Sequence, residues 1–222
     1  MVRVHVLVEG EAEETFAREV LSAYFSPHGI YLFPRRLGKR GHKSGVCKYP
    51  CAQREILITL KQDAQAFCTT MFDYYGMPPD WPKRKEARSK PFAERGILVE
   101  EAMLVDISSQ LGGGFDRSRF IPYVQMHEFE ALLFSDPKVL AGVLELTDDA
   151  PIRRITDQFT SPEEINDGQQ TAPSKRIRGL NPGYAKVLDG VRISQRIGLQ
   201  TMRTECPHFN EWIQTLEALA HH

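Results

Sequence analysis

The stretch that decides the fold of this chain is VRVHVLVEGEAEE, residues 2–14. Its first seven residues carry valine at every second position, which is the pattern of a β-strand. Glu9 and Gly10 end the strand, and apolar residues then recur at helical spacing as far as Tyr24. The stretch therefore predicts a strand followed directly by a helix at residues 11–25.

The same alternation of strand and helix continues along the chain. Apolar, β-prone runs predict further strands, and helical spacing predicts further helices, at these residues: strands 30–33, 64–72 and 119–126; helices 53–62, 92–111 and 208–220. This order predicts an α/β fold with a mainly parallel sheet flanked by helices. We expect an α/β core at residues 1–135 and a mainly helical C-terminal elaboration at residues 136–222, packed as a single globular unit.

Length and composition exclude several classes of protein. The chain has 222 residues, of which 41% are hydrophobic and 26% charged, so disorder is not expected. No apolar run reaches the roughly 18 residues of a membrane helix, and the N-terminus alternates too strictly for a signal peptide. We therefore expect a cytoplasmic protein without membrane contact. The net charge of −1 does not indicate a nucleic-acid partner, so that argument depends on local patches.

The four cysteines do not form a convincing metal or disulfide pattern. Cys47 and Cys51 lie close to His42, but no second close pair follows them, and Cys68 and Cys206 are distant. We therefore expect reduced, mostly buried thiols rather than a zinc site or a disulfide framework.

Acidic residues follow three of the expected strands. Glu9 follows the first strand, and Asp73 follows the apolar run at residues 64–72. The sequence HEFE at residues 127–130 follows the strand expected at residues 119–126. The carboxyl ends of parallel strands meet at one edge of a sheet, where ligands bind. Clustered carboxylates repel one another unless a cation compensates them, and oxygen ligands suit Mg²⁺ or Mn²⁺. The sequence thus predicts a divalent metal site.

The neighbouring residues have structural alternatives. Glu11 and Glu14 suit the first turn of a helix, where acids favour the dipole, and we prefer that role for them. Glu13 could flank the same ion as Glu9, and Gly10 is expected to allow a tight backbone turn. For His127 we favour a structural hydrogen bond. Whether Glu128 or Glu130 faces the site stays open.

The motif VLVEGEAE at residues 6–13 resembles the first motif of TOPRIM domains, in the form found in OLD (overcoming lysogenization defect) family nucleases. The whole chain also resembles a TOPRIM-like family of unknown function, whose members are often encoded beside AAA or SMC-like ATPases in loci that look like phage-defence systems. The segments that carry this second resemblance are TMFDYYG (70–76), PYVQMHEFEALLF (122–134) and CPHF (206–209).

The resemblance implies a TOPRIM-like, Rossmannoid catalytic core and a metal-dependent nuclease. Glu9 matches the first-motif glutamate, and Asp73 matches the first residue of the Asp-x-Asp motif. Tyr75 stands where the second Asp belongs, which puts two-metal catalysis in doubt. Asp80 could replace it only if the intervening loop folds back. The candidate residues are Glu9, Glu13, Asp73, Glu128 and Glu130 for Mg²⁺ or Mn²⁺, and Glu9, Asp73, Glu128 and Lys175 for catalysis.

Basic segments indicate where nucleic acid could bind. Residues 35–54 contain seven basic residues and no acid, and Trp81 beside residues 83–85 could stack on a base. The alternative is a solvated segment that only keeps the protein soluble. The candidate contacts are Arg35, Arg36, Lys39, Arg40, Lys43, Lys83, Arg84, Lys85 and Arg176.

Three functions remain open at this point. The first is a metal-dependent endonuclease for DNA or RNA that acts as the effector subunit of an ATPase-coupled anti-phage system. The second is a catalytically weak interaction subunit that docks on an AAA or SMC-like ATPase, since the chain has no Walker A motif of its own. The third is a phosphotransfer or small-molecule phosphoesterase role, since the same carboxylate and metal chemistry serves phosphate esters generally. The type of nucleic acid, the mode of cleavage, the number of metal ions and the oligomeric state, which could be a homo-oligomer, are not fixed by the sequence.

Overall fold

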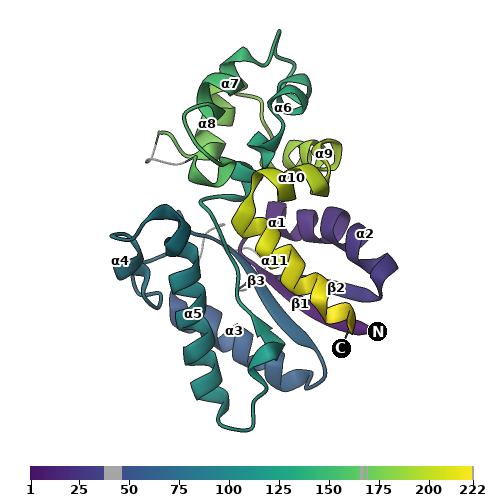
Figure 1. Cartoon of the computed structure of the whole chain (residues 1–222), viewed down its shortest axis with the longest axis vertical. Coiled ribbons are helices and arrows are strands. Elements are labelled where there is room, and N and C mark those ends of the chain that lie inside the picture. Colours follow the sequence, from purple (N-terminus) through teal and green to yellow (C-terminus); the bar gives the residue numbers. More distant parts are fainter. Residues whose placement is uncertain (38–46, 166–167, 169, 222) are drawn as a thin grey trace. The chain divides into compact units, whose positions relative to one another are not determined.

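The computed structural model describes residues 1–37, 47–165, 168 and 170–221 (Figure 1). The chain forms two compact units. Unit 1 consists of Met1–Val124 and Thr215–His222, and unit 2 consists of Gln125–Gln214. The division expected near residue 135 lies downstream of the one that separates these units.

A mainly parallel β-sheet forms the centre of unit 1. Its strands are β1 (Val2–Val8), β2 (Ile30–Arg36), β3 (Phe67–Asp73), β4 (Phe120–Ile121) and β5 (Val124–Gln125). They are ordered β2-β1-β3-β4, with parallel pairing between these neighbours, and β5 also pairs with β3. The expected α/β class with a mainly parallel sheet is therefore confirmed.

Helices flank this sheet. After β1 the chain forms α1 (Glu11–Phe16), the π-helix η1 (Ala17–Leu21), α2 (Ser22–Phe25) and the 3₁₀-helix η2 (Ser26–His28). After β2 it forms α3 (Tyr49–Gln62), and after β3 it forms α4 (Arg84–Ala87), α5 (Phe92–Leu111) and the 3₁₀-helix η3 (Arg117–Arg119). Figure 1 shows α1 and α2 on one side of the strands and α3 and α5 on the other. Right-handed crossovers produce this arrangement when the strand order reverses direction after β2.

Burial explains why these segments form the sheet. β3 is buried along nearly its whole length, as expected for a central parallel strand covered by helices on both faces. β2 alternates between buried Ile30 and Leu32 and exposed Tyr31 and Phe33, which fits its position at the edge. In the sequence this strand was predicted from its short apolar, β-prone run at residues 30–33.

The strand expected at residues 119–126 is split into β4 and β5. Thr70 explains the interruption, because its hydroxyl donates a hydrogen bond of 2.9 Å to the Tyr123 carbonyl oxygen and accepts one of 2.8 Å from the Tyr123 N–H. Pro122 next to it has no N–H for the ladder. A side chain therefore replaces backbone pairing at this point.

Unit 2 is mostly helical, as expected for the C-terminal half. Its elements are η4 (Phe129–Ser135), α6 (Pro137–Val143), α7 (Ala150–Thr156), η5 (Pro162–Glu164), α8 (Pro173–Leu180), α9 (Lys186–Ile197) and α10 (Leu199–Glu205). The chain then continues through α11 (Pro207–Ala218) and η6 (Leu219–His221) into the C-terminal segment of unit 1. In the ranges that the structure describes, no helix is both long and apolar enough to cross a membrane.

Candidate metal centre

Two of the predicted acids lie at the ends of adjacent central strands. β1 and β3 pair in parallel with Val8 opposite Met71, so Glu9 follows directly after β1 while Asp73 is the last residue of β3. The chain reverses its direction of travel through the sheet between these two strands, because β2 lies on one side of β1 and β3 on the other. Such a switch point leaves a crevice at the carboxyl ends, which is where open α/β sheets bind ligands.

Glu13 reaches the same place from the first turn of α1. Its side chain is 1% exposed, although an acid at this position of a helix is ordinarily solvated. Gly10 makes this possible, because a Cβ at that position would clash with Oε2 of Glu13. The chain bends at Glu9 and Gly10 as expected, but Gly10 is extended, with φ −133° and ψ 177°, so the bend itself does not require a glycine. Its role is to leave space for a carboxylate.

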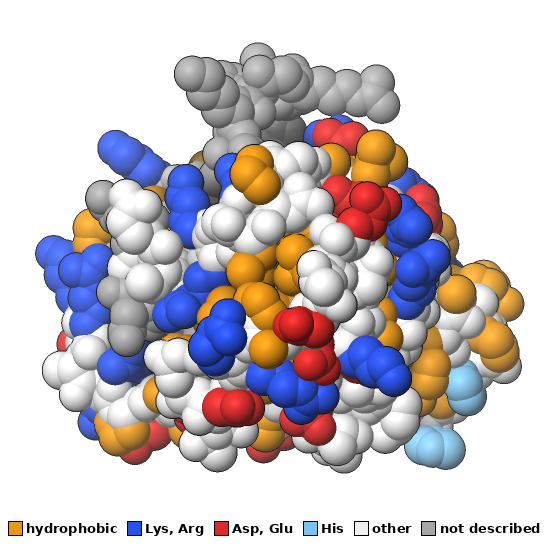
Figure 2. Space-filling view, turned by 90° about the horizontal axis from the view of Figure 1, so that it is seen from above, with side chains coloured by type: hydrophobic (Ala, Val, Ile, Leu, Met, Phe, Trp, Pro, Cys, Tyr) orange, Lys and Arg blue, Asp and Glu red, His pale blue; other side chains and the backbone are white. Residues whose placement is uncertain are grey.

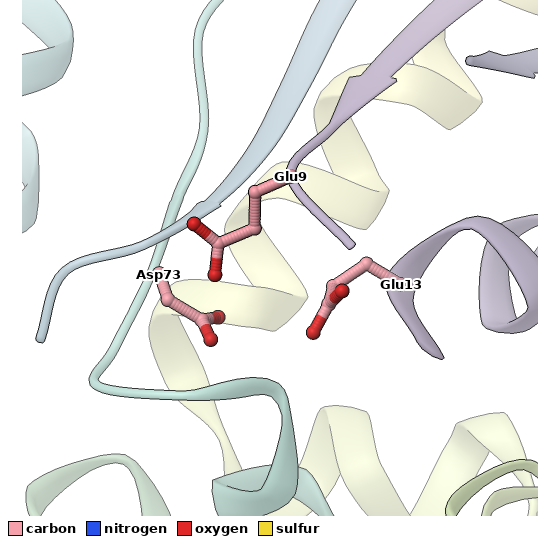
Figure 3. A group of neighbouring side chains, drawn as sticks. All are labelled: Glu9, Glu13 and Asp73. Carbon is pink, nitrogen blue, oxygen red and sulfur yellow. The ribbon is translucent and has the colours of Figure 1, made fainter. Parts of the chain in front are cut away.

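The carboxylates of Glu9, Glu13 and Asp73 form one cluster (Figure 3). One oxygen from each lies within 4.8 Å of the others, and the side chains of Glu13 and Asp73 are almost completely buried. Three like charges in a poorly solvated place are unfavourable unless a cation or protons compensate them. Ligands on opposite sides of a Mg²⁺ or Ca²⁺ ion are about 4 to 5 Å apart, so the donor set and its span fit one hard divalent cation.

The other acids of this helix turn have surface partners. Arg36 lies with Nε 2.8 Å from a Glu14 oxygen and with Nη1 3.8 Å from a Glu11 oxygen. Glu11 is mostly exposed, and its carboxylate is not among the three that cluster. These contacts agree with the helix-terminal role expected for Glu11 and Glu14.

The loop after β3 does not supply a fourth clustered carboxylate among the described residues. Tyr75 is half-buried at the position of the second Asp. Asp80, the suggested replacement, accepts a hydrogen bond of 3.2 Å from the N–H of Tyr49 at the start of α3. That bond gives Asp80 a structural role at the N-terminus of a helix.

The acids predicted from the later segment belong to unit 2 and have partners there. Glu128 accepts a hydrogen bond of 2.9 Å from the N–H of Ser174, and fully buried Glu130 lies 3.2 Å from Nζ of Lys186. His127 is buried as well. The contacts with Ser174 and Lys186 are structural ones within unit 2. The metal roles of Glu128 and Glu130 remain predictions.

The lysine expected to assist catalysis also lies in unit 2. Lys175 is exposed on α8, and Arg176 beside it donates from Nε to the Thr171 carbonyl oxygen at 2.7 Å. Their predicted roles on phosphate are not tested by these contacts.

The basic residues predicted to bind nucleic acid fall into three groups. Lys39, Arg40 and Lys43 lie outside the described residues. Arg35, Arg36 and Lys83 each form an ion pair, with Glu55, Glu14 and Glu86 respectively. Lys85 is exposed, whereas Arg84 is 5% exposed and so differs from a solvated loop residue. On the face shown in Figure 2, Lys and Arg side chains lie scattered among other surface groups, with acids mainly along the lower edge and on the right.

The cysteines match the expectation of reduced thiols. All four are free, with Cys68 and Cys206 buried, Cys47 half-buried and Cys51 exposed. Burial raises the pKa of the Cys47 thiol to about 12, so at neutral pH this residue is protonated.

The fold and the cluster together define a class, an α/β protein with a carboxylate site at the switch point of a parallel sheet. Within that class, residues 8–217 match the family described as "Domain of unknown function (DUF4276)", and the chain belongs to this family. No curated protein and no solved structure matches the chain.

Proposed function

We propose that this protein is a metal-dependent nuclease of the TOPRIM type, which hydrolyses phosphodiester bonds of DNA or RNA with Mg²⁺ or Mn²⁺. The observation that carries the proposal is the cluster of Glu9, Glu13 and Asp73 at the adjacent ends of β1 and β3. The resemblance of residues 6–13 to the first TOPRIM motif supports the same assignment of Glu9.

The three carboxylates would hold the ion, and one of them would also take part in proton transfer. A bound divalent cation supplies Lewis acidity and lowers the pKa of a water ligand. Three carboxylates carry a formal charge of −3, so one negative charge remains beside a divalent ion. A carboxylate oxygen can therefore accept the proton of an attacking water. Glu9 is the candidate for this step, since it is half-buried whereas Glu13 and Asp73 are almost completely buried.

A specific observation favours a second candidate, a catalytically weak subunit that docks on an AAA or SMC-like ATPase. Tyr75 offers no carboxylate where the Asp-x-Asp motif has its second Asp, and Asp80 binds the N–H of Tyr49. A single ion held by three residues would still permit hydrolysis, and it would also suit an activity that appears only with a partner. We keep an ATPase-coupled anti-phage role as part of the proposal, and it rests on the resemblance alone.

The test is nicking of supercoiled plasmid by purified protein with Mn²⁺ or Mg²⁺, together with calorimetric titration of the metal. Glu9→Gln is the test variant, and Glu11→Gln is its control, because Glu11 is a nearby exposed acid outside the cluster. We expect nicking and metal binding by the wild type and by Glu11→Gln, and neither by Glu9→Gln.

Other outcomes separate the alternatives. Metal binding without nicking favours the interaction subunit, and the assay is then repeated with the partner ATPase. Cleavage of nucleotides or other small phosphate esters, but not of polymers, points to a phosphoesterase. Wild-type metal binding by Glu9→Gln contradicts the site.

A further inference from the structure

Arg84 is a buried cation in unit 1 whose surroundings satisfy only part of its guanidinium. The residue is 5% exposed, its Nη2 donates a hydrogen bond of 3.1 Å to the Tyr74 carbonyl oxygen, and its guanidinium carbon lies 3.8 Å from the centre of the Tyr74 ring. Among the described residues, Nε and Nη1 have no hydrogen-bond partner. A buried charged group with unused donors is costly, which points to an acceptor that the chain itself does not provide.

Two further arginines lie near Arg84. Arg88 is one helical turn further along the chain, and Arg95 is in the first turn of α5, against which α4 packs (Figure 1). Burial lowers the pKa of Arg84, and the positive charges of Arg88 and Arg95 lower it further, although the Tyr74 side chain acts in the opposite direction. Arg88 and Arg95 are thus near enough to Arg84 for their charges to act on it.

Unlike Arg3, Arg35 and Arg36 of unit 1, the members of this group have no acidic partner among the described residues. Arg3 pairs with Asp63, and Arg36 pairs with Glu14, each at 2.9 Å or less. In the part of the chain that the structure describes, no ion pair joins Arg84, Arg88 or Arg95 to a carboxylate, and Nε of Arg95 donates to the Lys90 carbonyl oxygen. Repulsion without compensation is the arrangement expected of an anion site.

The group also lies next in the chain to the carboxylate cluster. The carbonyl that Arg84 holds belongs to Tyr74, the residue directly after Asp73. Arg84 is buried, Arg95 half-buried and Arg88 exposed, so the positive charge extends from the interior of unit 1 to its surface.

We propose that Arg84, Arg88 and Arg95 form a phosphate-binding site that receives a backbone phosphate of the nucleic acid. Guanidinium groups suit this ligand because their N–H donors match the geometry of phosphate oxygens. The identity of the ligand as a nucleic-acid phosphate rests on the proposed function, whereas phosphate binding itself requires neither the metal nor hydrolysis. The exposed Lys83 and Lys85 are outside this site.

Inorganic phosphate and a 5′-phosphorylated oligonucleotide are the probes, used without metal in the presence of a chelator. Differential scanning fluorimetry at constant ionic strength, with chloride as the reference anion, measures the response of Tm, and calorimetry measures the affinity. We expect phosphate to raise the wild-type Tm. Arg88→Ala and Arg84→Met should each weaken phosphate binding at least about tenfold, since each removes a charged donor. The control Lys61→Ala, at an exposed lysine of α3, should bind like the wild type.

A wild type that does not respond to phosphate more than to chloride overturns the proposal, and so does unchanged binding by Arg88→Ala. If Arg84→Met fails to fold, Arg88→Ala and Arg95→Ala decide, because their side chains are exposed and half-buried. Phosphate binding without any nuclease activity leaves the anion site established and refutes only the proposed hydrolysis. In an active enzyme, Arg88→Ala should raise KM and leave kcat and metal affinity unchanged.

Discussion

The two units treat their buried acids in opposite ways. In unit 2, the two oxygens of Glu163 accept hydrogen bonds of 3.0 Å from the N–H groups of His208 and Phe209, and Glu130 lies 3.2 Å from the ammonium group of Lys186. In unit 1, three acids are brought within 4.8 Å of one another. Burial of an acid alone therefore does not identify a site, whereas several carboxylates gathered within reach of one another form a group that could hold a metal ion.

The largest effect is expected from Asp73→Asn, which tests whether the cluster exists for a cation. Metal affinity should fall by at least about 100-fold, since loss of a ligand exceeds the tenfold to 100-fold effect of second-shell changes. The metal-free variant should have a higher Tm than the metal-free wild type, because one of three repelling charges is gone. Calorimetry and thermal melts measure both. A lower Tm with metal binding retained would show that Asp73 is structural.

Lys186→Met tests the contrasting environment in unit 2. It leaves the carboxylate of fully buried Glu130 without its ammonium partner, so the free energy of unfolding should fall by about 3 kcal/mol. Lys138→Met, at an exposed lysine of α6, is the control and should change stability by less than about 0.5 kcal/mol. Denaturant unfolding provides the measurement. Equal stability of the two variants would remove the distinction drawn between the units.

Gly10→Ala tests whether the space at this glycine is needed to hold Glu13 in the acidic cluster. The added Cβ would clash with the Glu13 carboxylate, which must then move away from the cluster. Metal affinity should fall about tenfold, or about 1.4 kcal/mol, without loss of the fold. Gly113→Ala, where a Cβ meets no atom within 4 Å, should bind metal like the wild type. Equal affinity in both variants would show that the space at Gly10 has no function in the site.

The pH dependence of unfolding tests Glu163. Burial raises the pKa of this carboxyl above its ordinary value of 4.5, and the nearby His208 and two backbone N–H groups offset part of that increase. The folded state therefore binds the proton more tightly than the unfolded state, and this group's contribution to stability decreases as pH rises through its folded pKa. The unfolding free energy of the wild type, relative to that of the non-titrating variant Glu163→Gln, should fall as pH rises from about 4 to 7. A constant difference over that range contradicts the assignment.

The smallest effect is expected for Arg36→Ala. Its ion pairs with Glu14 and Glu11 are partly exposed, and such pairs contribute about 0.5 kcal/mol or less. Denaturant unfolding in low and high salt should show a small difference that salt removes. A loss of metal binding in this variant would mean that Arg36 belongs to the site rather than to its surroundings.

The parts of the site that could be predicted from the sequence are those carried by local patterns. Alternation identified β1, the apolar run identified β3, and the acids that end them followed directly from the residue order. The general rule for parallel sheets then placed Glu9 near Asp73. The helix expected at residues 53–62 begins earlier, at Tyr49. Its true start was missed because the capping residue is Lys48, and no acidic or hydroxyl side chain marks that position in the sequence.

Features that depend on distant contacts could not be predicted. Nothing near Glu130 in the sequence announces Lys186 as its partner, and nothing in the run of basic residues at 83–85 distinguishes buried Arg84 from exposed Lys85. Gly10 was recognised as significant but for a wrong reason, since its backbone is extended and its function is to leave space for a side chain. Packing decides these cases, and packing is not a local property of the sequence.

The composition of unit 1 has a consequence for biosynthesis. Thr215–His222 belong to this unit, and the hydroxyl of Tyr24 donates a hydrogen bond to the Glu217 carboxylate. On the ribosome, Met1–Val124 emerge first, all of unit 2 follows, and the segment that completes unit 1 emerges after it. The strands that carry the acidic cluster are thus translated before all of unit 2, and unit 1 is complete only after the segment that begins at Thr215 has been made.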